Sequence, residues 1–154
     1  MRLSKKGEYA LRAVIDLGLH YGDGPVSIVD IAARQKIPLK FLEQILLALK
    51  KAGYLASKRG VGGGYSLARS PNRITLGELI RTIDGPLAPL ACASQTAYRA
   101  CSDCGDVNQC GIRSIMLEVR NAIANILDHV TLEDALNRTR SMARARAPLF
   151  DFSI

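Results

Sequence analysis

A basic, glycine-rich turn constrains the fold of this chain more than any other feature. The turn, residues 59–64 (RGVGGG), joins two short segments of strand-like sequence, residues 54–58 and 65–69. Glycine permits backbone conformations that side chains forbid, so the pattern predicts a tight β-hairpin with a positively charged end. A nucleotide-binding loop is disfavoured, because the turn lacks a Gly-Lys-Ser/Thr ending and a strand rather than a helix follows it.

Three helices are predicted before this hairpin. Apolar residues recur at helical spacing over residues 5–21. Ser27 with Asp30 three positions later is typical of a helix N-terminus and predicts a short helix over residues 28–35. Pro38 suits the first turn of the next helix, expected over residues 39–52.

The third of these helices has two chemically different faces. Its aliphatic residues follow the spacing of a core-facing stripe: Leu42, Ile45, Leu46 and Leu49. The opposite face carries Lys40, Gln44 and Lys51, flanked by Glu43 and Leu47. Basic and amide side chains on such a face can reach phosphates and base edges in a DNA major groove. The order short helix, turn, helix and basic hairpin therefore predicts a mainly α fold with a small β-hairpin wing, a winged helix-turn-helix.

The charge distribution agrees with a polyanionic partner. The chain carries a formal net charge of +7. Residues 1–84 contain 14 Lys and Arg against 7 Asp and Glu, whereas residues 85–154 contain 7 of each, so the excess lies wholly in the first part. Basic surface favours nucleic acid, because each neutralised phosphate releases counterions.

All four cysteines lie in one irregular segment, residues 85–110. They are Cys92, Cys101, Cys104 and Cys110. Clustered thiols in an intracellular chain indicate metal or redox chemistry rather than structural disulfides. Only one Cys-x-x-Cys pair is present and no histidine is near it, so the spacing leaves three alternatives open: an iron–sulfur cluster, zinc, or a metal-free thiol switch.

A long helix is predicted over residues 112–129. Ile112, Val119 and Ile126 repeat every seven residues, and Ile115 with Ala122 continues a second seam. Such a stripe indicates a partner helix, most simply that of a second copy in a homodimer, although packing within one chain is the alternative. Thr131 then precedes a short helix over residues 132–138, and residues 141–154 are expected to form a mobile tail.

Other function classes find little support. No apolar run is long enough to span a bilayer and no secretory leader is visible, so we expect a cytoplasmic protein with no membrane contact. No phosphate loop, Ser/His/Asp set or paired-carboxylate site stands out. The sequence thus predicts neither catalysis nor a small-molecule substrate.

Several motifs together resemble the Rrf2 family of bacterial regulators, which includes iron–sulfur cluster regulators and a nitric-oxide sensor. The resemblance covers nearly the whole chain and rests on these segments: MRLSKKGEYA at residues 1–10, FLEQI at 41–45, RGVGGGY at 59–65, Cys104-x5-Cys110, and VTLED at 130–134.

The resemblance implies a homodimer on a palindromic operator in double-stranded DNA. It implies that Lys40, Glu43 and Gln44 help to read the major groove and that Arg59 enters the minor groove. Together with the composition of the outward surfaces, this gives the expected DNA-binding set: Lys40, Glu43, Gln44, Lys51, Lys58, Arg59, Gly60 and Gly62.

The resemblance also implies a [2Fe-2S] or [4Fe-4S] cluster with Cys92, Cys104 and Cys110 as ligands. The chain departs from the cluster regulators in two ways: Arg113 stands where they have a histidine three residues after the last cysteine, and a Trp common after that cysteine is missing. A fourth ligand would then be Cys101, or Glu8 from the other subunit.

The resulting hypothesis is a transcriptional regulator, a repressor, whose operator affinity responds to iron, redox state or nitric oxide through the cluster. The alternatives are the same dimer with a thiol, disulfide or zinc switch, and an iron–sulfur electron carrier. The expected organisation is a DNA-binding domain (1–84), a cysteine-bearing sensor loop (85–110), a dimerisation helix with a short C-terminal helix (111–140) and the tail (141–154).

Overall fold

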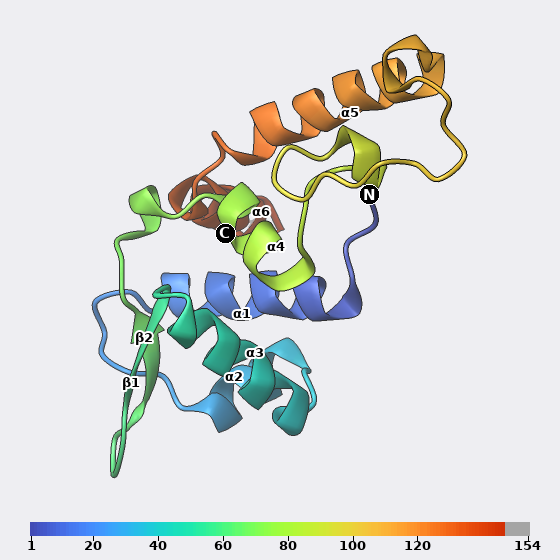
Figure 1. Ribbon diagram of the computed structural model, residues 1–154. Helices are drawn as coiled ribbons and strands as arrows, with labels where there is room; N and C mark the ends of the chain where they lie inside the picture. The colour runs from blue at the N-terminus through green and yellow to red at the C-terminus, as the bar shows by residue number, and fades with distance from the viewer. Residues whose placement is uncertain (147–154) are drawn as a thin grey trace, which may run out of the picture.

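The computed structural model describes residues 1–146. Within these residues the chain forms α-helices around one two-stranded hairpin, as Figure 1 shows. The elements in order are α1 (Lys5–Leu19), α2 (Ile28–Gln35), α3 (Leu39–Lys51), β1 (Leu55–Lys58), β2 (Gly64–Leu67), α4 (Leu76–Asp84), α5 (Gly111–Leu127) and α6 (Leu132–Arg146). This confirms the predicted mainly α fold with a hairpin wing, and the predicted bounds of α2 match the structure at both ends.

Helix α1 is the centre of the hydrophobic core. It contacts α2 and α3 on one side and α4 and α6 on the other, so that it lies between two layers of helices (Figure 1). Its residues Ala13, Val14 and Leu17 are at most 1% exposed. The stripe predicted for α3 is buried as expected, with Leu42, Ile45, Leu46 and Leu49 all fully inaccessible to solvent.

Side-chain caps fix where the helices begin. Ser27 Oγ accepts a hydrogen bond from the Asp30 N–H at 3.2 Å, which confirms the predicted start of α2. Thr75 Oγ1 accepts from the Glu78 N–H in the same way at 3.2 Å. Each cap satisfies a backbone donor that the first turn of a helix leaves without a partner.

The hairpin is slightly shorter than predicted and gains a third segment. Its strands are antiparallel, with Leu55 opposite Leu67 and Lys58 opposite Gly64. Val26, just before α2, forms an isolated bridge with Tyr65 through two N–H···O bonds of 2.8 Å. The hairpin is therefore attached to the segment that leads into α2, close to its turn.

The predicted end of the last helix was wrong. Helix α6 continues to Arg146 instead of ending at residue 138. Leu132 and Leu136 anchor it in the core, and the following segment is rich in Ala, Arg and Met, which favour helix. Residues 141–146 of the expected tail are consequently helical, and its remainder lies outside the described residues.

Residues 85–110 contain only two single turns of 3-10 helix, Ala91–Ala93 and Val107–Gln109, as the absence of periodicity predicts. Helix α5 follows and lies across α4 (Figure 1). Arg81 of α4 holds its end, donating to both carboxylate oxygens of Asp128 at 2.5 and 2.9 Å. Among residues 1–146, no helix has the length and apolar character that crossing a bilayer requires.

Candidate nucleic-acid interface and cysteine pocket

The turn between α2 and α3 is set by one left-handed residue. Lys36 ends α2 with φ 53° and ψ 48°, and its N–H donates to the carbonyl of Ala32. The next residue, Ile37, is only 4% exposed and enters the core. The turn thereby brings Pro38 to the start of α3 and fixes the direction in which α3 leaves.

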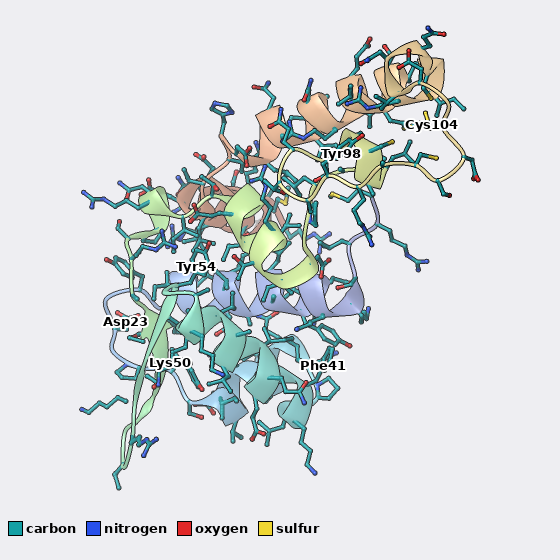
Figure 2. All side chains as sticks on the ribbon, viewed as in Figure 1. Asp23, Phe41, Lys50, Tyr54, Tyr98 and Cys104 are labelled. Atoms are coloured by element: carbon teal, nitrogen blue, oxygen red, sulfur yellow. The ribbon has the colours of Figure 1, made fainter. Side chains whose placement is uncertain are left out.

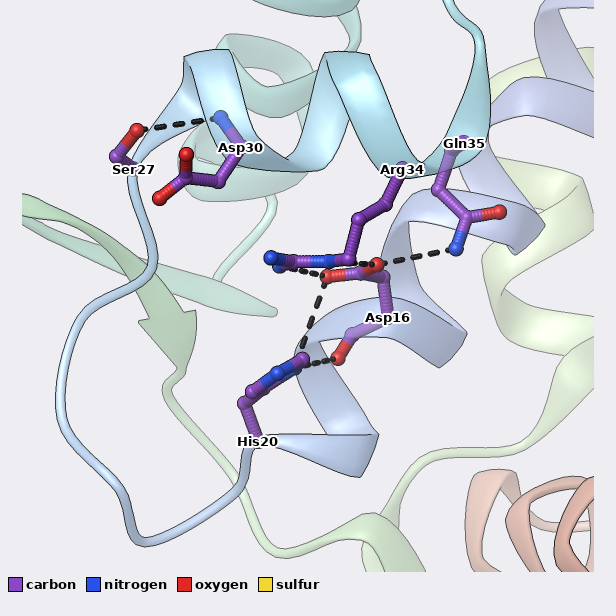
Figure 3. A network of polar contacts seen from close by, with 6 residues as sticks. All are labelled: Asp16, His20, Ser27, Asp30, Arg34 and Gln35. Atoms are coloured by element: carbon purple, nitrogen blue, oxygen red, sulfur yellow. Dashed lines mark hydrogen bonds and ion pairs between the residues drawn. The ribbon is translucent and has the colours of Figure 1, made fainter.

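A buried carboxylate joins α1 to α2, as Figure 3 shows. The side chain of Asp16 is 3% exposed and accepts hydrogen bonds from Arg34 Nε (3.0 Å), Arg34 Nη2 (2.8 Å) and Gln35 Nε2 (3.0 Å). Burial raises the pKa of Asp16, but the hydrogen bonds from Arg34 and Gln35 outweigh it and leave the pKa below its ordinary value. The ionised carboxylate thus holds the last turn of α2 against α1.

A second group of contacts braces the first turn of α3. Tyr9 and Phe41 meet edge to face, with ring centroids 5.7 Å apart. The guanidinium of Arg12 lies 5.4 Å from the Tyr9 ring centroid and donates to the carbonyl of Gln35. The Tyr9–Phe41 contact joins α1 to α3, and the charge-assisted contact of Arg12 joins α1 to the end of α2, just before the turn that leads into α3.

Sequence reasoning missed these positioning residues. Their partners lie on another helix, between 18 and 32 residues away along the chain. One signal was present: Asp16 stands among the apolar residues that α1 buries, where an unpaired carboxylate would be costly.

The outward face of α3 carries the predicted DNA-binding residues. The structure leaves all four exposed to solvent: Lys40, Glu43, Gln44 and Lys51. The opposite face is wholly buried, so these side chains point away from the core. The helix presents a mixed basic, acidic and amide surface that no element within residues 1–146 covers.

The hairpin presents a second exposed basic surface. The exposed residues are Lys58, Arg59 and Val61, and Val61 at the tip is fully exposed, at 104% relative exposure. Gly60 and Gly62 have φ values of 91° and 73°, in the left-handed region that favours glycine. In Figure 1 the hairpin lies beside α2 and α3, and its tip extends to the lower left beyond both helices.

Close approach of backbone explains the last glycines of the turn. A Cβ on Gly63 would lie 2.3 Å from the carbonyl oxygen of Lys58, and one on Gly64 would lie 2.1 Å from that of Val26. Both distances are far below van der Waals contact. The run of glycines is therefore required by the tight turn and by the bridge to Val26.

The four cysteines line one pocket of about 440 Å³ between the 85–110 loop and the start of α5. Cys92, Cys104 and Cys110 are partly buried, and Cys101 is exposed. Figure 2 shows Cys104 beside the N-terminal end of α5, far from Lys50 and the hairpin. The pocket is thus separate from both predicted DNA-binding surfaces.

The pocket is formed around the beginning of α5. Cys110 is the N-cap of that helix, and its Sγ accepts from the Arg113 N–H at 3.4 Å. Arg113 Nε in turn donates to the carbonyl of Cys92 at 2.9 Å, which joins the two ends of the loop. A helix N-terminus and a guanidinium make this wall of the pocket electropositive.

The thiols are near enough to influence one another. Desolvation, followed by the neighbouring Cys110, Cys101 and Cys92, raises the pKa of the Cys104 thiol above its ordinary value. Even so, in residues 1–146 no three His, Cys, Asp or Glu side chains converge closely enough to hold a single metal ion.

The chemistry of the donor set nevertheless fits an iron–sulfur cluster. The thiolate ligands of such a cluster bind different iron atoms, so they need not converge on one point. A cluster with thiolate ligands is also anionic, which suits a pocket with an arginine and a helix N-terminus in its wall. Glu8, the other predicted ligand, is not among the lining residues. Its carboxylate is 48% exposed on α1 and pairs with Lys5 at 3.3 Å.

One side of α5 remains uncovered in the single chain. Ile112, Ile115, Val119 and Ile126 are between 40% and 66% exposed, whereas Arg120 and Ala124 on the other side are buried. Within residues 1–146, the predicted apolar stripe therefore does not pack against another element.

A helix-turn-helix followed directly by a basic hairpin defines a winged-helix, DNA-binding protein of the transcription-regulator class. The chain belongs to the Rrf2 family. The model of that family, described as an iron-dependent transcriptional regulator, matches residues 3–138.

Named relatives agree with this assignment. An Rrf2-like HTH-type transcriptional regulator of Rhodobacter capsulatus is 45% identical over 137 residues, covering 87% of this chain and 91% of the relative. The structure is similar to CymR, the global cysteine regulator of B. subtilis (TM-score 0.75, 33% identity, 90% of this chain and 98% of that one). It is similar also to T. potens IscR (TM-score 0.73, 33% identity, 96% and 93%). The relatives are transcriptional regulators rather than enzymes.

Proposed function

We propose that this chain forms a homodimeric repressor whose affinity for a palindromic operator is switched by an iron–sulfur cluster held in the cysteine pocket. The observation that carries the proposal is the gathering of all four cysteines around one pocket at the start of α5. That pocket lies where a change in the loop can act on a helix with an unpartnered apolar face.

In the proposed complex, α3 lies in the major groove. Lys40 and Lys51 neutralise phosphates, while Gln44 and Glu43 hydrogen-bond to base edges. Lys58 and Arg59 enter the minor groove from the wing, and the backbone at Gly60 and Gly62 lies close to the sugar–phosphate chain. The exposure of every one of these residues supports this arrangement.

The dimer forms in this proposal through the exposed isoleucines of α5. Two α5 helices would cover each other's apolar face, which a soluble monomer would otherwise leave in contact with water. A palindromic operator then requires two half-sites about one helical turn, roughly 34 Å, apart.

For the cluster, Cys92, Cys104 and Cys110 are the proposed ligands. Cys101 lines the same pocket and is one source of the fourth ligand. The other is Glu8, which would have to come from the partner subunit because it does not reach the pocket of its own chain. When bound, the cluster supplies a group that oxidants, nitric oxide or iron depletion can alter. Arg113 supports it by holding the Cys92 carbonyl at 2.9 Å.

The ends of the loop show how the pocket could act on the DNA-binding surfaces. The loop begins at Gly85, directly after Asp84, whose carboxylate accepts from the Ser4 N–H at 2.8 Å at the start of α1. It ends at Cys110, the N-cap of α5. Ordering the loop would therefore fix α5 relative to α1 and set the spacing of the two DNA-binding heads. Such coupling is reciprocal, so operator binding would also stabilise the occupied pocket.

A thiol switch without a cluster is the second candidate, and one contact favours it. The Cys104 N–H donates to the Cys101 carbonyl at 3.4 Å, so the Cys-x-x-Cys pair is folded into a turn. The similarity to a cysteine regulator is consistent with this candidate. Zinc bound by the same thiols would serve the same purpose.

Purification without oxygen, followed by a visible spectrum and iron and sulfide analysis, separates the candidates. A cluster gives broad absorption from thiolate-to-iron charge transfer with matching iron and sulfide. Cys104→Ala should abolish it, whereas Ser102→Ala in the same loop should retain it. A colourless protein with zinc or without metal would refute the cluster and leave the thiol switch.

The switch itself is tested on the operator. Removing the cluster from the pure protein should change operator affinity, and restoring it should restore the affinity. Unchanged affinity would refute the sensor, while a flat dependence of binding on salt concentration would refute DNA binding itself.

A further inference from the structure

One leucine lies at the centre of the proposed DNA-reading face. The buried residues of α3 are Leu42, Ile45, Leu46 and Leu49. Successive side chains of an α-helix are rotated by about 100° around its axis. The direction directly opposite to the mean direction of these four buried side chains falls between Leu47 and Lys51, and Lys40 lies almost on it. Leu47 thus stands among the polar residues of the outward face rather than at its edge.

Core packing among residues 1–146 does not account for an apolar residue at this position. Leu47 is 46% exposed and takes no part in the hydrophobic core. A face that met only water would gain from lysine, glutamate or glutamine, which favour helix equally well and stay solvated. A leucine flanked by Lys40, Gln44 and Lys51 is instead suited to a partner that is anionic but carries an apolar group.

Duplex DNA has such a group in the major groove. Base edges there present hydrogen-bond donors and acceptors, and their apolar feature is the 5-methyl group of thymine. We propose that Leu47 reads thymine in each half-site by packing against its 5-methyl group. This inference rests on the proposed DNA binding and adds to it a determinant of sequence specificity, because a methyl contact discriminates thymine from cytosine.

The test removes the methyl group from the DNA rather than only the side chain from the protein. A duplex is selected from a random pool by the wild-type protein, and each thymine is then replaced singly by deoxyuridine. Losing contact with one methyl group should weaken binding about fourfold, because burying one such group contributes roughly 0.8 kcal/mol. We expect this at one or two positions in each half-site.

Leu47→Ala provides the matching protein change. Alanine favours helix and Leu47 is exposed, so the variant should fold, as circular dichroism would verify. It should bind the thymine and deoxyuridine duplexes equally, so that the two changes are not additive. Val29→Ala, which shortens a 60% exposed side chain on α2, should leave the deoxyuridine profile of the wild type unchanged.

Two outcomes would overturn the inference while leaving the proposed function intact. In one, the selected duplex tolerates deoxyuridine everywhere, although Gln44→Ala weakens binding. In the other, Leu47→Ala remains as sensitive to deoxyuridine as the wild type. If the wild type selects no sequence and shows no salt-dependent binding, the proposed DNA binding fails first and the inference with it.

Discussion

Helix α6 should contribute to the stability of the DNA-binding head, and Leu136→Ala tests this directly. Leu136 is 2% exposed and packs against α1 at Gly18, where a Cβ would lie only 2.8 and 2.9 Å from the two Leu136 methyl carbons. The leucine therefore touches the backbone of α1. A helix backbone cannot move inward to fill the space that truncation leaves.

The size of the effect follows from that geometry. Leucine-to-alanine changes at buried sites cost about 2.7–5.0 kcal/mol, and the upper part of the range applies where the cavity cannot collapse. We expect Leu136→Ala to lower the free energy of unfolding by about 3–4 kcal/mol. For a domain with a total of roughly 5–15 kcal/mol, this is a large fraction.

The assay is urea denaturation followed by far-ultraviolet circular dichroism at one fixed protein concentration, because the proposed dimerisation would make apparent stability depend on concentration. Met142→Ala is the control: it lies on the same helix but is 66% exposed, so its effect should stay within about 0.5 kcal/mol. A loss below about 1 kcal/mol for Leu136→Ala would refute the docking of α6 on α1.

Three further predictions concern the polar contacts and the wing. The pKa of Asp16 in the folded protein lies below its unfolded value of about 3.9, so the contribution of Asp16 to stability is complete above that pH and is lost as the pH falls through the folded-state pKa. Asp16→Asn should therefore make the loss of stability in acid less steep than in the wild type. An unchanged dependence of stability on pH would contradict the ion pair. A double-mutant cycle on Arg81 and Asp128 should give a coupling of about 0.5–1 kcal/mol, because the pair is bidentate but partly exposed; zero coupling would mean that α5 is not held there. Gly64→Ala should weaken operator binding about tenfold by displacing the Val26 bridge, while helix content stays as in the wild type; unchanged operator binding would contradict a role for the bridge.

The elements that the sequence predicted well are those with local signals. Helix α2 has a Ser cap at one end and a helix-breaking proline three residues after its last residue, so both of its ends are marked within a few residues. The hairpin is marked by its glycines. Its attachment to Val26 was not predicted, because a single bridge to a residue some forty positions earlier leaves no periodic pattern.

Elements that depend on tertiary docking were predicted less well. The final helix was expected to end at residue 138, but it continues to Arg146. It continues because Leu132 and Leu136 hold it on α1 and the residues that follow favour helix. The Asp16 network was missed for the same reason. Clustering of the cysteines in the sequence did predict a common site, but their arrangement around one pocket depends on a loop with no regular pattern.

Helix α4 connects the cysteine pocket with the DNA-binding head. Arg81 in its last turn holds the C-terminal end of α5 at Asp128, and Asp84 in the same turn holds the start of α1 at Ser4. A Cβ on Gly7 would lie 2.4 Å from the Asp84 carboxylate, so α1 and α4 have no room to slide over each other. A movement of α5 must then either carry α4 and α1 with it or break the Arg81–Asp128 pair. In the proposed switch, weakening that pair should consequently reduce the difference in operator affinity between the occupied and empty pocket more than it reduces operator affinity itself.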